Sequence, residues 1–138
     1  MTRPSAGQLD RARRLLASEA GSGGGSEGAA EAAARVYERL DAQLAPLLGR
    51  AGVRALFARS AKLAETELAS LADATEDSAK LSARLQSLEA TAAGEAAVAL
   101  FGSFLELITT FIGERLTVQV LRSAWPAIEE TAPRETQK

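Results

Sequence analysis

Apolar residues between Ala96 and Trp125 recur at intervals of three and four, the spacing that places side chains on one face of an α-helix. The segment reads AAVALFGSFLELITTFIGERLTVQVLRSAW and holds three of the four Phe residues and the only Trp. Because the largest apolar side chains are concentrated here, we expect this segment to lie at the centre of the core. Gly113 interrupts the pattern, which predicts one helix over 95–112 and another over 114–128.

The rest of the chain holds shorter amphipathic segments, which we expect to form helices that cover this one. Helical spacing of apolar residues predicts helices over 8–20, 29–48, 53–71 and 77–92. Leu9, Ala12 and Leu16 would form the apolar side of the first. Pro46 should kink or end the second near Ala45, and Gly94 should end the fourth. The predicted fold class is all-α, an up-and-down bundle of four main helices plus a short N-terminal helix.

This pattern divides the chain into four parts. Residues 1–20 would hold the short N-terminal helix, and residues 21–28, GSGGGSEG, would be a flexible Gly/Ser linker. The helical bundle would span 29–130. The remaining residues, 131–138, would be a disordered tail.

The composition is typical of a globular helical protein, and the sequence argues against secretion and against a membrane span. The 138 residues suit one domain, and 46% are hydrophobic, mostly the helix formers Ala and Leu. The net charge of −2 predicts no strong attraction to nucleic acid or anionic membranes. The chain has no Cys, its N-terminus lacks the apolar stretch of a signal peptide, and Glu106 interrupts the only candidate membrane span, 96–113. We therefore expect a cytoplasmic protein with no membrane partner.

The absence of His and Cys excludes most of the chemistry that helical proteins carry. Zinc sites, Glu-x-x-His di-iron sites, His- or Cys-ligated haem and Ser-His or Cys-His nucleophile pairs all need residues that the chain lacks. Glu106 is the best candidate for a perturbed carboxylate, but its spacing from Ser103 and Thr110 predicts a narrow polar side facing solvent. The sequence therefore predicts no enzyme, no catalytic residue, no metal and no cofactor.

The segment 95–112 is apolar on more than one side, which is typical of a helix covered by other helices or by a second subunit. We expect a protein-interaction surface formed by Leu100, Phe104, Leu107 and Phe111. A homodimer is the expected partner, and another protein is the alternative. Three basic residues, Arg50, Arg54 and Arg59, would tune orientation and association rate through charge. The predicted function is a non-enzymatic adaptor or regulator.

Two other functions remain open at this point. Residues 47–60, LLGRAGVRALFARS, have a Gly-containing turn followed by an Arg-bearing helix, so a DNA-binding regulator with a helix-turn-helix-like segment is one alternative. The other is a bundle that holds a small apolar ligand, because Ala-rich helix contacts can leave cavities.

The segments PLLGRAGVRALFARS (46–60) and LFGSFLELITTFIGERLTVQVLRSAW (100–125) resemble those of small uncharacterised helical proteins of bacteria. The resemblance covers apolar packing positions together with Gly49, Gly52, Gly113 and Trp125. Because such proteins are associated with signalling genes, the resemblance implies a role in bacterial signalling, and it implies no catalytic residue.

Overall fold

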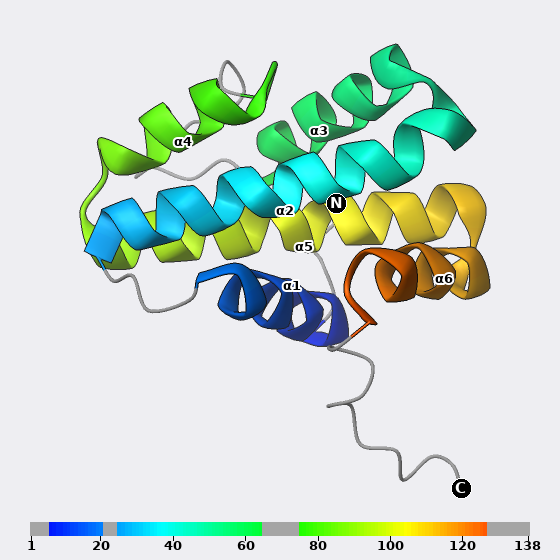
Figure 1. Cartoon of the computed structure of the whole chain (residues 1–138), viewed down its shortest axis with the longest axis horizontal. Helices are drawn as coiled ribbons and strands as arrows, with labels where there is room; N and C mark the ends of the chain where they lie inside the picture. Colours follow the sequence, from blue (N-terminus) through cyan, green and yellow to red (C-terminus); the bar gives the residue numbers. More distant parts are fainter. Residues whose placement is uncertain (1–5, 21–24, 65–74, 127–138) are drawn as a thin grey trace, which may run out of the picture.

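A computed structural model describes residues 6–20, 25–64 and 75–126 of the chain. These residues form six α-helices and no strand (Figure 1). The all-α prediction is therefore confirmed for the described residues. The helices are α1 (Ala6–Ala20), α2 (Gly25–Leu48), α3 (Arg50–Ala64), α4 (Ser78–Gln86), α5 (Ala90–Ile112) and α6 (Glu114–Ala124).

Two long helices, α2 and α5, form the centre of the fold, and each packs against the other five helices. In Figure 1, α3 and α4 lie on one side of this pair and α1 and α6 on the other. The residues of α2 and α5 that face their neighbours are therefore mostly apolar. The expectation that the segment rich in Phe lies at the centre of the core is confirmed.

Stacked aromatic rings join α2, α3 and α5. The ring of Phe57 stacks on Tyr37 and on Phe104, with centroid distances of 4.3 and 4.1 Å, and meets Phe101 edge-on at 6.2 Å. Phe57 and both of its phenylalanine partners are fully buried. Offset and edge-on ring pairs contribute attraction beyond the burial of apolar area, so this cluster fixes how α3 sits on the central pair.

Helix α2 begins four residues earlier than predicted and ends at the predicted residue, Leu48. It begins at Gly25, so residues 25–28 form its first turn and are not a linker. Residues 21–24 of the expected linker and the expected tail, 131–138, lie outside the described residues. Pro46 neither ends nor shortens the helix, which continues to Leu48. The helix continues for two residues past Pro46, although proline has no N–H for the helical bond to the carbonyl four residues earlier.

The boundary between the fourth and fifth predicted helices is wrong. Helix α4 ends at Gln86 and α5 begins at Ala90, so Gly94 lies inside α5 instead of ending a helix. The chain leaves the helix at Ser87, whose hydroxyl donates to the Arg84 carbonyl at 2.6 Å. At the other end of α4, Asp77 caps the helix by accepting from the backbone N–H of Lys80 at 2.8 Å.

Glycines 49 and 113 are the two described residues with positive φ, at +83° and +94°. Each lies between two helices, where a residue with a Cβ would be strained. The predicted break at Gly113 is confirmed. Because Gly49 alone makes the turn between α2 and α3, α3 starts at Arg50 and not at Val53. Helix α6 ends at Ala124, four residues before the predicted end at 128.

Helix α5 is also the one described helix that is long and apolar enough to cross a membrane. A little under half of its most apolar stretch is buried inside the fold. The central helix of a globular fold can have the same length and apolar composition as a membrane-spanning helix. The expectation of no membrane partner therefore stays a prediction.

Candidate interaction sites

The predicted interaction residues of α5 divide into core and surface. Leu100 and Phe104 are fully buried, so no partner can contact them while the chain is folded. Leu107 is half-buried and packs against the core. Phe111 is 65% exposed. Inclusion of Leu100 and Phe104 in a contact surface was therefore wrong, because α2 and α3 already cover that side of α5.

Three large exposed apolar side chains lie in the last turns of α2 and α5 and in the first turn of α6. Leu47 in the last turn of α2 is 53% exposed, and Leu116 in the first turn of α6 is 36% exposed. Both central helices end on the right of Figure 1, where α6 begins. We call Leu47, Phe111 and Leu116 the apolar end. A contiguous apolar patch on a protein surface commonly contacts another protein.

The three predicted arginines do not share one face of α3. Arg50 and Arg54 are one turn apart, whereas Arg59 projects from the opposite side of the helix. Arg50 pairs with Asp41 across 3.9 Å, and Arg54 Nε donates to the Glu76 carbonyl at 2.5 Å. A helix that reads DNA presents its basic side chains on one side. These arginines therefore form neither a common DNA-reading face nor a common rim for the apolar end.

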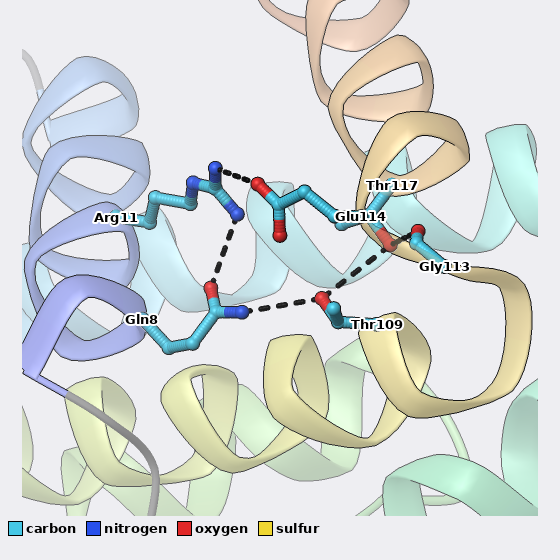
Figure 2. Close-up of polar contacts among 6 residues, drawn as sticks. All are labelled: Gln8, Arg11, Thr109, Gly113, Glu114 and Thr117. Atoms are coloured by element: carbon cyan, nitrogen blue, oxygen red, sulfur yellow. Dashed lines mark hydrogen bonds and ion pairs between the residues drawn. The ribbon is translucent and has the colours of Figure 1, made fainter.

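A polar network holds the first half of α1 against the turn between α5 and α6 (Figure 2). Gln8 Nε2 donates to Thr109 Oγ1 at 3.1 Å, and Gln8 Oε1 accepts from Arg11 at 3.2 Å. Arg11 Nη2 also forms an ion pair with Glu114 at 2.7 Å. Gln8 is buried, so its amide needs these partners. Behind it, the Thr117 hydroxyl donates to the Gly113 carbonyl at 2.8 Å.

A second polar cluster holds the last turn of α1. The Glu19 carboxylate, only 9% exposed, accepts from Arg39 Nε at 2.6 Å and from Trp125 Nε1 at 2.7 Å. Arg39 in turn donates to the Ala124 carbonyl at 2.9 Å, which is an otherwise unpaired acceptor at the end of α6. The backbone carbonyl of Glu19 accepts from Arg35 at 3.2 Å. Glu19 thus joins α1 to both α2 and α6.

Sequence reasoning missed both clusters. It assigned Leu9, Ala12 and Leu16 to the apolar side of α1, whereas the fully buried pair is Ala12 and Leu15. Gln8 lies seven residues before Leu15, and Glu19 lies four residues after it. Both spacings place a residue on the same side of a helix as Leu15. A polar residue within an apolar helix face is a signal of a buried hydrogen bond, and this signal was present in the sequence.

The described residues hold no group of three or more His, Cys, Asp and Glu residues that could bind a metal. Glu106 is half-buried on α5. Ser103, expected on a solvent-facing side with it, is buried, and its hydroxyl has no hydrogen-bond partner among the described residues. An open groove of about 440 Å³ runs between α1 and α5, and it is lined by Leu9, Arg13, Gly94, Glu95, Val98 and Ala99.

Tyr37 is a buried titratable group with a clearly shifted pKa. Its hydroxyl donates to the Thr75 carbonyl at 2.7 Å in the core. Burial raises the pKa of Tyr37 above its ordinary value of 10.0, because the phenolate would lose its hydration there. The hydroxyl therefore stays protonated and serves as a structural donor.

No protein-family model, curated protein or solved structure significantly matches this chain. The sequence resemblance to small helical bacterial proteins stays a prediction.

Proposed function

We propose that this protein is a non-enzymatic adaptor or regulator that acts through protein–protein contacts, and that the apolar end is the contact surface of a homodimer. The observation that carries the proposal is Phe111, a phenylalanine left 65% exposed at the end of the central helix. Transferring a phenylalanine side chain from water to an apolar contact gains about 1.5–3 kcal/mol. A second copy would supply the matching apolar surface.

The neighbours of Phe111 support this assignment. Leu107 lies one turn earlier on the same side of α5 and is half-buried, so the apolar surface continues from the core to Phe111. Gly113 follows α5 with a φ of +94°, and α6, which carries Leu116 in its first turn, begins at the next residue. An aromatic side chain on a rigid helix loses little conformational entropy on binding, which favours its use as an anchor.

Light scattering over a dilution series tests the homodimer, with the wild type compared to Phe111→Glu. We expect a wild-type dimer and a folded Phe111→Glu monomer, because the charge would be buried in the contact. Leu63→Glu is the matched control, since Leu63 is exposed on α3, away from the apolar end. A wild type that stays monomeric at every concentration would show that the apolar end does not pair two copies.

Several sequence-based expectations stay predictions. These are the bacterial signalling role, the cytoplasmic localisation and the up-and-down arrangement of four main helices. DNA binding through 47–60 and binding of a small apolar ligand stay alternatives. A salt-sensitive shift of duplex DNA that Arg54→Ala and Arg59→Ala abolish would favour the first of these alternatives.

A further inference from the structure

The groove between α1 and α5 is open because α5 presents small residues there. Gly94 and Ala99 line it together with Val98, and Leu9 lines it from α1. A Cβ added to Gly94 would meet nothing within 4 Å, so neighbouring side chains leave the space beside it unfilled. The groove measures about 440 Å³, within the range of about 300–1,000 Å³ that is usual for small-molecule sites. We call it the α1–α5 groove.

The floor of the α1–α5 groove is apolar and only partly covered. Leu9, Val98 and Ala99 are each half-buried, and Val98 packs against the core. A half-buried side chain at the edge of a core still exposes apolar area to water. A ligand with an apolar body that covers these side chains would remove that area from water, which is favourable in proportion to the area covered.

Each wall of the groove carries one charged side chain. Arg13 comes from α1 and Glu95 from α5, and both are exposed. Neither forms a hydrogen bond or an ion pair with another residue that the structure describes. Arg14, the next residue of α1, does have such a partner, since it pairs with Asp10 at 2.8 Å. The apolar floor therefore lies between a free cation and a free carboxylate.

We propose that the α1–α5 groove binds a small amphipathic zwitterion, a molecule with an apolar body, one carboxylate and one ammonium group. Its carboxylate pairs with Arg13, whose planar guanidinium can donate two parallel N–H bonds. Its ammonium donates to Glu95, and its apolar body covers Leu9 and Val98. An apolar amino acid and a short apolar peptide with free ends share this chemistry. The groove uses none of the residues of the apolar end, so either proposal can fail without the other.

A ligand with a single charge fits the groove less well. A carboxylate without an ammonium brings its charge close to Glu95, and an ammonium alone brings its charge close to Arg13, so each meets a like charge. A neutral apolar ligand covers the floor but gains nothing from the charged walls. The two unpaired charges thus select the zwitterion over both kinds of competitor.

NMR shifts of the backbone amides, recorded on the full chain as ligand is added, test the proposal because they detect weak binding and also locate it. The probes are the dipeptide leucyl-leucine with free ends and free leucine. We expect shifts concentrated at Leu9, Arg13 and residues 94–99. Tighter binding of the dipeptide would assign the groove to peptides, and tighter binding of leucine would assign it to amino acids. No shifts there from either probe, up to its solubility limit, would overturn the proposal.

Capped dipeptides separate the two charges of the ligand. N-acetyl-leucyl-leucine lacks the ammonium and leucyl-leucine amide lacks the carboxylate. Each should bind about two- to five-fold more weakly than the free dipeptide, which corresponds to one exposed ion pair. Arg13→Ala should abolish only the preference for the carboxylate, and Glu95→Gln only the preference for the ammonium. Capped dipeptides that bind the wild type as tightly as the free one would show that the charged walls recognise nothing, against the proposal.

A variant that fills the groove gives an independent check. Gly94→Leu adds its side chain where a Cβ meets nothing, so this variant should fold normally and lose the ligand-induced shifts. Ala55→Leu, at an exposed position on α3, is the matched control and should bind as the wild type does. Unchanged affinity in folded Gly94→Leu would place the ligand elsewhere and overturn the proposal.

Discussion

Trp125 Nε1 donates a hydrogen bond to Glu19 Oε2 at 2.7 Å, although 106 residues separate them in the chain. Trp125 follows the last residue of α6, and Glu19 lies in the last turn of α1. Arg39 of α2 binds the same carboxylate oxygen and lies 5.9 Å from the centre of the indole ring. Because Trp125 is the only Trp in the chain, its fluorescence reports on whether α1 is docked.

Glu19→Gln should therefore destabilise the fold and change the tryptophan emission. The amide keeps the shape of the side chain but weakens its bonds to Arg39 and Trp125, at a cost of about 1–3 kcal/mol in the free energy of unfolding. The emission maximum should move to longer wavelength as water reaches the indole. Urea unfolding and emission spectra measure both effects. Glu31→Gln, an exposed site on α2, is the control and should leave both unchanged.

Two glycines should respond to alanine in opposite directions. At both Gly94 and Gly113 an added Cβ would meet nothing within 4 Å, so backbone conformation decides the outcome. Gly94 is inside α5, where alanine should stabilise by about 0.5–1 kcal/mol. Gly113 has φ of +94°, where alanine should destabilise by about 1–3 kcal/mol. Thermal unfolding followed by circular dichroism measures both, and a stabilising Gly113→Ala would contradict the assigned turn.

Phe57→Ala should be among the most damaging substitutions in α3. Its ring stacks on Tyr37 and Phe104, and its removal leaves a cavity between three helices. We expect a loss of about 3–5 kcal/mol in the free energy of unfolding. Ala58→Gly, at an exposed neighbouring position, should cost only about 1 kcal/mol through helix propensity. Similar losses for the two variants would mean that α3 does not pack on the central pair as described.

The stability of the protein should fall above pH 10 because of Tyr37. Burial raises the pKa of Tyr37 in the folded chain above the 10.0 expected when it is unfolded. Above pH 10 the unfolded chain releases the phenol proton while the folded chain keeps it, so unfolding becomes more favourable as pH rises towards the folded pKa. Tyr37→Phe should lower stability at neutral pH, through loss of the bond to Thr75, but remove this part of the pH dependence.

Urea unfolding of the wild type and Tyr37→Phe at pH 8 and at pH 11 measures the difference. Tyr37 is the only tyrosine, so the comparison between the two chains isolates its titration from that of the lysines. Parallel loss of stability in the two proteins between these pH values would show that the phenol does not ionise on unfolding.

Helix identity could be predicted from local pattern, whereas several helix boundaries could not. The three- and four-residue spacing of Leu81, Leu85 and Leu88 continues past the end of α4, so periodicity alone predicted a helix that was too long. The break comes at Ser87, and no local signal in the leucine spacing marks it. Similarly, the low-complexity run before Ala29 hid the first turn of α2, which begins at Gly25.

The sequence by itself determined the all-α class, the concentration of core side chains in α5, the turn at Gly113 and the lack of His and Cys chemistry. These follow from side-chain periodicity, glycine conformation and composition, which are local properties. Only the tertiary structure decided that Phe104 is core while Phe111 is exposed, and that Glu19 meets Arg39 and Trp125. Both depend on which helix covers which side of another, and that choice is made by the whole set of packed surfaces at once.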